Sequence, residues 1–285
     1  MGNILSRHPK TPQPQPTPSS SPSSSPYSSS SSSQRFQIKP IDPFTDIPPL
    51  TRAIWDAFEN PYQGIVHLFY PLLNNDKEQS IQTAIENIAE EYRTNQPQLT
   101  WVKVIDTQND DLIVAAAKWF FYEEDPHAGA HGHEGNGDGE GIVADWFPEG
   151  VSRDFATQAV RLFEGPREGL AKGPHAFLNI AFTLPPYRRQ GLAILFMDWG
   201  LKIADERGLE AWLDASEFGA PLYEKYGFRK IGVNPVRPVP GRNLSEEEKE
   251  VWEDCERDLL PIEYTVMWRP VKGVFVEGET VSPSM

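Results

Sequence analysis

Two neighbouring arginines and a glycine are the strongest candidates for chemistry in this sequence. They are Arg188, Arg189 and Gly191, in the segment TLPPYRRQGLAI at residues 183–194. Guanidinium groups carry donors that match phosphate oxygens, and a glycine lets an anion approach the backbone closely. The segment therefore predicts a site for a phosphate-bearing ligand. Taken alone, RRQG is equally consistent with a capped turn that carries two solvated arginines.

The elements on either side would place this turn at the start of a helix. Residues 176–182 (AFLNIAF) form a mostly apolar run that ends before two prolines, which indicates a buried strand. Apolar side chains then recur every three or four residues from Leu192 to Ile203, which predicts an amphipathic helix from about Gly191 to Gly208. The first amides of a helix lack carbonyl partners and carry partial positive charge, so a phosphate there would satisfy them.

Two motifs resemble those of a known family. The spacing Arg188-x-x-Gly191-x-Ala193, after a strand and at a helix start, resembles the pyrophosphate-binding loop of the GNAT superfamily of acyl-CoA-dependent N-acyltransferases. Downstream, residues 210–215 (EAWLDA) alternate as a short strand, and residues 220–228 (APLYEKYGF) predict a short helix that ends at a glycine. The second segment is similar to the terminal helix signature of that family.

The resemblance implies an α/β fold with a mixed, mostly antiparallel central sheet flanked by helices. It also implies a splayed strand pair, where the pantetheine arm of CoA enters the gap and pairs with the free strand edge. The resemblance spans about residues 36–270, and its specific motifs lie in 176–208 and 210–231. The front half agrees in element order alone, with a strand at 37–41, helices at 51–59 and 77–92, and paired strands at 101–106 and 112–122.

The resemblance also assigns roles to individual residues, with acetyl-CoA as the cosubstrate. The implied cofactor contacts are Phe182, Thr183 and Leu184 for pantetheine, and Arg188, Arg189, Gln190, Gly191, Leu192, Ala193 and Ile194 for pyrophosphate. Tyr223 takes the part of the general acid that protonates the departing CoA thiolate, and Tyr226 is the alternative. The sequence departs from the family at Ser216, where many members have an asparagine that contacts the cofactor. A serine can still donate one hydrogen bond.

Transfer of an acyl group to an amine also needs a group that accepts the proton of the amine. Glu123 and Glu124 follow a predicted strand, and His175 opens the strand of the first motif, which also holds Asn179. These three ionisable residues are the candidate bases. Each could equally be structural or solvated, as surface acids usually are.

Composition limits the possible partners and divides the chain. The 285 residues carry a formal net charge of −15, which argues against a nucleic-acid partner because such binding depends on basic residues. The Pro- and Ser-rich run at residues 9–33 has too little apolar surface to order itself. We therefore predict a disordered tail at 1–34, a GNAT domain at 35–270 and a C-terminal tail at 271–285.

The N-terminus and the cysteine content bear on localisation. The single Cys255 and the absence of an apolar run of about 18 residues indicate a reducing, cytoplasmic setting. The first residues, MGNILS, match the pattern for N-myristoylation of Gly2, and a chance match in a disordered start is the alternative. Because one acyl chain anchors weakly, we expect membrane contact only through a lipidated Gly2.

Two insertions, at 123–173 and 234–260, separate the expected strands. The first contains a helix around 153–163 and is a candidate lid or substrate-side subdomain. It also contains His127, His131 and His133 near carboxylates, which are possible metal ligands. A Gly-rich loop has no rigid element to fix ligand geometry, so we expect a solvated loop and no metal. In the second insertion, SEEE at 245–248 predicts a capping box that starts an acidic helix.

These observations predict an acetyl-CoA-dependent N-acetyltransferase that passes the acetyl group directly to an amine, without a covalent acyl-enzyme. The large insertions and the absence of a peptide-recognition motif favour a small-molecule amine over a protein N-terminus or lysine. The alternative is a non-catalytic module on the same fold that senses acyl-CoA or binds another partner. Tyr223 favours the enzyme, because a sensor has no chemical need for an acid.

Overall fold

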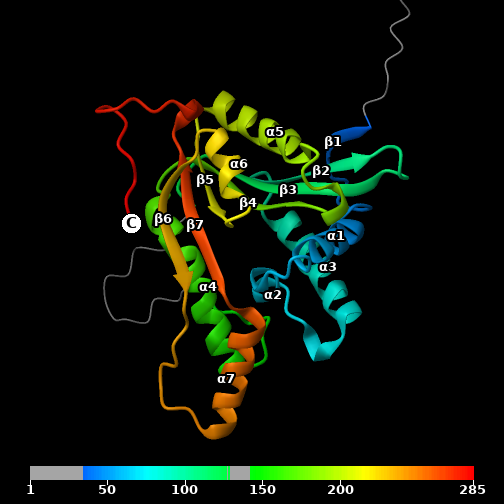
Figure 1. Cartoon of the computed structure of the whole chain (residues 1–285), viewed down its shortest axis with the longest axis vertical. Helices are drawn as coiled ribbons and strands as arrows, with labels where there is room; N and C mark the ends of the chain where they lie inside the picture. The colour runs from blue at the N-terminus through cyan, green and yellow to red at the C-terminus, as the bar shows by residue number, and fades with distance from the viewer. Residues whose placement is uncertain (1–34, 127, 129–141) are drawn as a thin grey trace, which may run out of the picture. The chain divides into compact units, whose positions relative to one another are not determined.

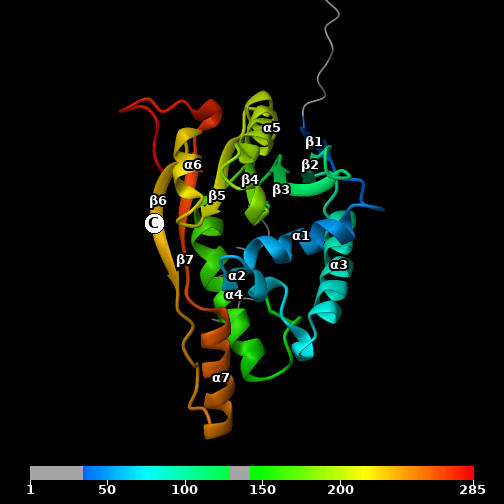
Figure 2. The same cartoon turned by 45° about the vertical axis from the view of Figure 1, so that its right-hand side comes forward.

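The computed structural model describes residues 35–126, 128 and 142–285, in which a seven-stranded sheet carries helices on both faces (Figures 1 and 2). The strand order is β1-β2-β3-β4-β5-β7-β6. The strands are β1 (Phe36–Pro40), β2 (Leu99–Asp106), β3 (Leu112–Tyr122), β4 (His175–Thr183), β5 (Glu210–Ala215), β6 (Arg229–Val236) and β7 (Ile262–Arg269). All neighbours are antiparallel except β4 and β5, which are parallel. The expected mixed, mostly antiparallel α/β fold is confirmed.

The helices follow most of the apolar patterns of the sequence. They are α1 (Ile47–Phe58), α2 (Gly64–Phe69), α3 (Lys77–Thr94), α4 (Val151–Leu170), α5 (Leu192–Arg207), α6 (Ala220–Lys225) and α7 (Glu246–Leu259), with 3-10 turns at Leu73–Asn75, Pro185–Tyr187 and Val271–Gly273. The predicted capping box starts α7, where Ser245 and Glu248 each accept a backbone N–H from the other. The short helix α2 was not predicted. None of the described helices is long and apolar enough to cross a membrane.

Residues 1–34 and the Gly- and His-rich stretch at 129–141 lie outside the described residues, as does His127. The hypotheses of a disordered tail and of a lipidated Gly2 therefore remain predictions. So does the expectation of a solvated loop in the first insertion, because His131 and His133 fall in the undescribed stretch. In the part of the chain that is described, no group of three or more His, Cys, Asp or Glu side chains could hold a metal ion.

Different helices cover the two faces of the sheet. On one face α5 packs along β2, β3 and β4 and buries its own Phe196 and Leu201. On the other face α1 packs on β3 and β4, and α4 packs on β5 and β6, with Ile54 and Phe155 buried. In Figure 1, α5 lies above these strands and α1, α3 and α4 lie below them. Each face therefore has its own apolar core.

The helix α5 approaches the sheet closely at Gly200. A Cβ atom at this position would lie 2.2 Å from Cε2 of Trp119, a fully buried residue of β3. We expect Gly200→Ala to lower the free energy of unfolding by about 1–3 kcal/mol, because overpacking forces the ring or the helix to move. Denaturant unfolding measures this change.

A matched control is available in α4. A Cβ atom at Gly169 would meet no other atom within 4 Å, so Gly169→Ala should be neutral or stabilising. Equal stability of the Gly200→Ala variant and the wild type would contradict the close packing against Trp119.

The helix α4 continues through Pro166, beyond the end that the sequence predicted. A proline has no N–H to bond the carbonyl oxygen four residues earlier, which here belongs to Leu162. Asn234 of β6 donates its Nδ2 to that oxygen at 2.7 Å. Tyr264 of β7 donates its hydroxyl to the neighbouring carbonyl oxygen of Phe163. Side chains from β6 and β7 therefore stabilise the last two turns of α4.

Candidate active site

The strands β4 and β5 part near the middle of the sheet. Residues 175–178 of β4 pair in parallel with residues 210–213 of β5. The next residue, Asn179, is an extra residue in the ladder between β3 and β4. A bulge of this kind bends and twists its strand. From Asn179 to Thr183, within the described residues, the edge of β4 that faces β5 therefore has no strand partner.

A cavity of about 380 Å³ lies at this opening, and we call it the β4–β5 cavity. Its walls come from the end of α1, the α1–α2 connection, β4, α5, the β5–α6 connection and α6. Six of the residues predicted to bind the cofactor or act as the acid line it: Phe182, Thr183, Arg188, Ala193, Ser216 and Tyr223. The structure therefore brings both sequence motifs to one cavity.

The start of α5 lies beside this cavity and offers free backbone donors. Gly191 precedes the first turn with φ of 80°, and no side chain in the described part of the chain caps this helix start. Ile194 donates its N–H to the oxygen of Gly191 at 3.1 Å, and the amides of Leu192 and Ala193 are available to an anion. Arg189 and Gln190 are exposed next to them, whereas Leu192 is buried in the core and can offer only its amide. The side chain of Ile194 is half-exposed.

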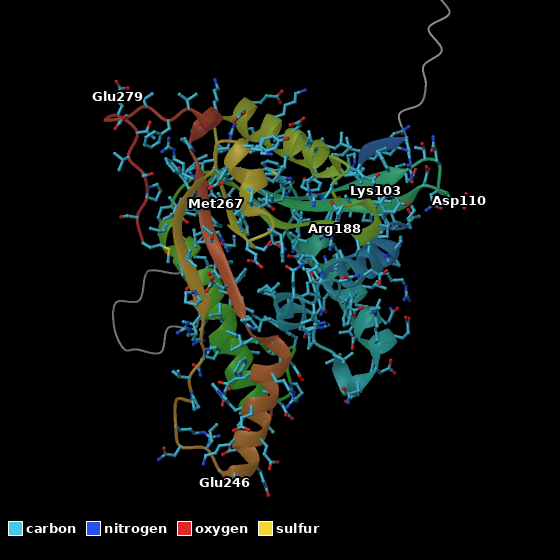
Figure 3. The ribbon with its side chains drawn as sticks, viewed as in Figure 1. Lys103, Asp110, Arg188, Glu246, Met267 and Glu279 are labelled. Atoms are coloured by element: carbon cyan, nitrogen blue, oxygen red, sulfur yellow. The ribbon has the colours of Figure 1, made fainter. Side chains whose placement is uncertain are left out.

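The side chain of Arg188 bonds the backbone instead of facing an open anion site. Its Nε donates to the oxygen of Thr183 at 3.1 Å, and its two terminal nitrogens donate to the oxygens of Asn60 at 2.5 Å and Ala57 at 2.6 Å. Figure 3 labels it beside α1 and the end of β4. Carbonyl groups at a helix end lack partners within the helix, which explains this use of the guanidinium. The sequence analysis assigned these donors to phosphate. In the structure Arg188 positions the turn, and the exposed Arg189 has no ion-pair partner among the described residues.

Tyr223 is held in place by its neighbours in the β4–β5 cavity. A Cβ atom at Gly219 would lie 2.8 Å from its Cε2 and 3.4 Å from its hydroxyl oxygen, and its ring centroid is 6.0 Å from that of Phe228. Burial raises the pKa of Tyr223 to about 12, so the phenol is protonated at neutral pH. The alternative, Tyr226, does not line the cavity and donates its hydroxyl to Asp198 of α5 at 2.8 Å.

Two further predicted contacts have backbone roles. The hydroxyl oxygen of Ser216 accepts the N–H of Gly219 at 3.3 Å at the start of α6, so its proton is still free to be donated into the cavity. Leu184 donates its backbone N–H to Val114 of β3 at 2.9 Å, and its side chain does not line the cavity.

The three predicted bases lie at the opposite end of β4. His175 is fully buried at the first residue of β4, with its ring centroid 5.1 Å from that of Tyr122. Glu123 and Glu124 directly follow β3, and the side chain of Glu123 is 80% exposed with its carboxylate 3.9 Å from Arg207. Because β3 and β4 are antiparallel, the end of β3 meets the start of β4 and not its splayed half. None of the three lines either cavity that borders β4.

A second cavity, of about 400 Å³, borders β4 on the face covered by α2, α3 and α4, and we call it the α4 cavity. Glu164 of α4 lines it, and its Oε2 is buried with no hydrogen-bond partner among the described residues. Burial raises the pKa of Glu164 to about 7, although Arg167 opposes this rise. Glu164 is not among the predicted bases, because the sequence predicts a helix end near residue 163 and nothing local marks this acid as buried.

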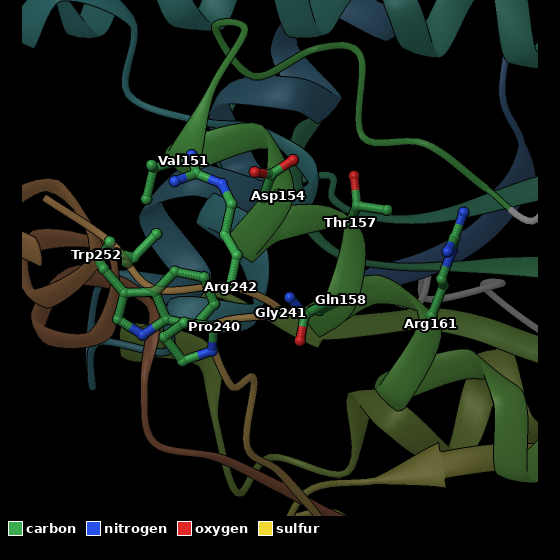
Figure 4. Close-up of a pocket in the computed structure, with 10 residues that line it drawn as sticks. Val151, Asp154, Thr157, Gln158, Arg161, Pro240, Gly241, Arg242 and Trp252 are labelled. Carbon is green, nitrogen blue, oxygen red and sulfur yellow. The ribbon is translucent and has the colours of Figure 1, made fainter. Parts of the chain in front are cut away.

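A third cavity, of about 320 Å³, lies between α4 and the segment that connects β6 to α7 (Figure 4). Arg242 and Trp252 line it together with Asp154 of α4. The guanidinium of Arg242 bonds Glu248 at 2.6 Å, so its charge is already paired. No residue of β4 lines this cavity, which separates it from the splayed strands.

Comparison with known proteins gives the family of this chain. No curated protein matches it. Among solved structures, a mosquito arylalkylamine N-acetyltransferase like 5b shares its fold, with a TM-score of 0.50 and 13% identity over 82% of this chain and 99% of that chain. The histone acetyltransferase HPA2 and related acetyltransferase of Corynebacterium glutamicum has a TM-score of 0.47 and 16% identity, over 84% and 97% of the two chains. The model of the acetyltransferase (GNAT) family matches residues 66–228, which is more than half of the sequence. The chain therefore belongs to the acetyltransferase (GNAT) family and is an acyltransferase.

Proposed function

We propose that the protein transfers the acetyl group of acetyl-CoA directly to the amine of a small molecule, with Tyr223 as the general acid. One observation carries this proposal: the unpaired edge of β4, the uncapped start of α5 and the phenol of Tyr223 all border the β4–β5 cavity. These are a backbone edge, an anion site and an acid, which are the three groups that a bound acyl-CoA thioester requires.

Each part of the cavity has a separate task. The amides at the start of α5, with Arg189, bind the pyrophosphate of CoA. The edge of β4 from Asn179 to Thr183 pairs with the pantetheine arm as an added strand would. When bound, acetyl-CoA supplies an activated acyl group as a thioester. Phe182 and Ser216 line the cavity in which that group is held.

In the transfer step, the nitrogen of the neutral amine attacks the carbonyl carbon, a C–N bond forms and the C–S bond breaks. Tyr223 gives its hydroxyl proton to the sulfur that leaves, and a proton released from the amine nitrogen replaces the proton that Tyr223 has lost. A covalent acyl-enzyme through Cys255 is not supported. This residue lies on α7 and lines none of the three cavities, and burial raises the pKa of its thiol to about 11, so little thiolate forms.

The pyrophosphate site is tested by Gly191→Glu. The new carboxylate would repel phosphate at the start of α5, and the φ of 80° strains any side chain. Free CoA at about 100 times its dissociation constant should stabilise the wild type by about 2.7 kcal/mol. We expect the variant to lose this stabilisation, measured as the shift in melting temperature on addition of CoA.

The matched control is Gly150→Glu. Gly150 also precedes a helix, α4, with a positive φ of 105° and open space around it. The control places the same charge at another helix start, where φ of 105° and ψ of −150° suit a side chain even less than the backbone of Gly191, so it should keep the stabilisation by CoA. If CoA stabilises the Gly191→Glu variant as well as it stabilises the wild type, then CoA does not bind at the start of α5.

Turnover is measured as thiol release from acetyl-CoA with a panel of small amines. We expect release that depends on the amine, together with the acetylated product by mass spectrometry. Stabilisation by CoA without release for any amine would instead support the non-catalytic sensor.

A further inference from the structure

The α4 cavity and the β4–β5 cavity border successive residues of β4. Asn179 and Ile180 of β4 line the α4 cavity, and the next three residues, 181–183, line the β4–β5 cavity. We infer that the α4 cavity binds the acceptor, a primary amine with an aromatic or other apolar group and no carboxylate, and that Glu164 accepts the proton of this amine. The inference rests on the acetyl transfer proposed above and names its second substrate.

The position of Glu164 suits a base. The cations that stand near its carboxylate are already paired: Arg167 donates to Asp214 at 2.9 Å, and Lys118 donates to Glu91 at 2.7 Å. The buried Oε2 of Glu164 has no hydrogen-bond donor among the described residues. Burying a polar atom without a partner costs free energy, and an ammonium group in the α4 cavity would remove that cost.

The charges that line the α4 cavity favour a cation. Three carboxylates line it, those of Glu91, Asp145 and Glu164. Lys118 is the one cation among the described residues that line it, and both oxygens of Glu91 accept from its Nζ, at 2.7 and 3.0 Å. An amine would therefore enter a site with an excess of negative charge, whereas a carboxylate on the same molecule would meet no free cation.

Most of the remaining wall of the α4 cavity is apolar, and much of it is aromatic. Phe69, the last residue of α2, and the following Tyr70 line it together with Trp146 and Phe163. The ring centroid of Phe69 is 6.5 Å from that of Trp146 and 6.0 Å from that of Phe163, so these three rings form one surface. A ring or alkyl group attached to the amine would bury apolar area there, and the volume of about 400 Å³ suits a small molecule.

The proton path follows from this placement. The acceptor arrives as an ammonium ion, and the Glu164 carboxylate takes one proton from it, which leaves a neutral nitrogen with a free electron pair. That pair forms the C–N bond described above while Tyr223 protonates the CoA sulfur. A second proton leaves the nitrogen as the amide forms and returns to the Tyr223 phenolate, and Glu164 releases the first proton to solvent, so both residues regain their starting protonation after each turnover.

The substrate class is tested with three probe amines: 2-phenylethylamine, ethylamine and phenylalanine. Ethylamine lacks the phenyl ring, so its kcat/KM should be about 10- to 100-fold lower than that of 2-phenylethylamine, because burial of one aromatic group contributes a factor of this size. Phenylalanine keeps the ring and adds a carboxylate beside the amine. We expect its kcat/KM to be at least about 100-fold lower than that of 2-phenylethylamine. Equal rates for 2-phenylethylamine and phenylalanine, or acetylation of neither while CoA still binds, would overturn the substrate class.

The role of Glu164 is tested with Glu164→Gln, which keeps the shape and removes the base. We expect kcat to fall about 10²- to 10³-fold, with an unchanged melting-temperature shift on addition of CoA. The wild-type rate should rise as pH passes through about 7, where Glu164 loses its proton, and the variant should lack this rise. The charged groups that act on Glu164 are Arg167 and Glu168 of α4, Asp214 of β5 and Lys118 of β3.

Two controls separate catalysis from folding. Glu168→Gln makes the same change one turn later on α4, outside the α4 cavity, and should keep the wild-type rate at pH 8. Burial raises the pKa of Glu164 above the ordinary value of about 4.3, so its ionisation lowers stability as pH rises from there through about 7. Glu164→Gln should therefore melt no lower than the wild type at pH 8.

The failure of this inference differs from the failure of the proposed function. If Glu164→Gln keeps both the rate and its rise near pH 7, while CoA binding and the need for Tyr223 persist, Glu164 is not the base and the acetyl transfer stands. If Gly191→Glu leaves CoA stabilisation unchanged and no amine is acetylated, the proposed function itself fails.

Discussion

Tyr223→Phe is expected to lower kcat about 10²- to 10⁴-fold and to leave the stabilisation by CoA unchanged. The change removes one hydroxyl group and keeps the ring, which remains packed above Gly219 and against Phe228. Without the phenol proton, the CoA sulfur must leave as a thiolate in a partly enclosed cavity, where an unpaired charge is costly. Steady-state thiol release with a fixed amine measures the effect.

Tyr226→Phe is the matched control, because the same atom is removed three residues later. The hydroxyl of Tyr226 bonds Asp198 outside the β4–β5 cavity, so its loss should leave kcat unchanged. Equal losses of activity in both variants would show that neither phenol acts as the acid and that the effect comes from packing of α6.

The pH profile gives a second test of Tyr223. Burial raises its pKa to about 12, so the phenol stays protonated from pH 6 to 10. An ordinary tyrosine has a pKa of about 10 and would therefore be half deprotonated at pH 10. We therefore expect the wild-type rate to hold up to pH 10, and a decline centred near pH 10 would argue against a buried acid.

Asp214→Asn is expected to lower the free energy of unfolding by about 3–5 kcal/mol. Asp214 of β5 and Arg167 of α4 form an ion pair at 2.9 Å, and each side chain is only 5% exposed. The variant keeps the shape of the side chain but leaves the Arg167 guanidinium, which also lies 3.8 Å from the ring centroid of Phe177, buried without the carboxylate that it bonds. Urea unfolding at pH 7 measures the loss.

The double variant Arg167→Met/Asp214→Leu separates the net contribution of the ion pair from the cost of leaving one charged partner buried alone. Burial raises the pKa of Asp214 even beside Arg167, so the ionised pair already carries a desolvation cost. Replacing both partners with apolar groups of similar volume should therefore cost much less than Asp214→Asn alone. A single variant as stable as the wild type would mean that Arg167 finds another partner.

Short-range patterns predicted most of the fold. The apolar spacing that starts at Leu192 predicted α5, the alternation of 210–215 predicted β5, and SEEE predicted the start of α7. Each of these features depends on residues only a few positions apart, so the sequence contains the whole signal. The strands β6 and β7 were not predicted, and neither was α2, which is only six residues long.

The site was harder to predict because its contacts are long-range. Arg188 bonds Ala57, which is 131 positions earlier in the chain, and no local pattern reveals that its donors are used there. The three predicted bases were chosen by closeness to the motif strand in sequence, and the antiparallel pairing of β3 and β4 places them at its far end. Glu164 becomes distinct from other acids only when α4 packs against α2, β5 and β6, because tertiary packing buries it.

The bonds from Asn234 and Tyr264 to α4 also make the two cavities depend on different parts of the chain. The family motifs that form the β4–β5 cavity are complete by residue 228, whereas the strands that hold the last two turns of α4 follow them in the chain. Those turns carry Glu164, so one wall of the α4 cavity depends on strands that lie outside both motifs. A change in β6 or β7 could therefore alter the α4 cavity while both motifs stay intact.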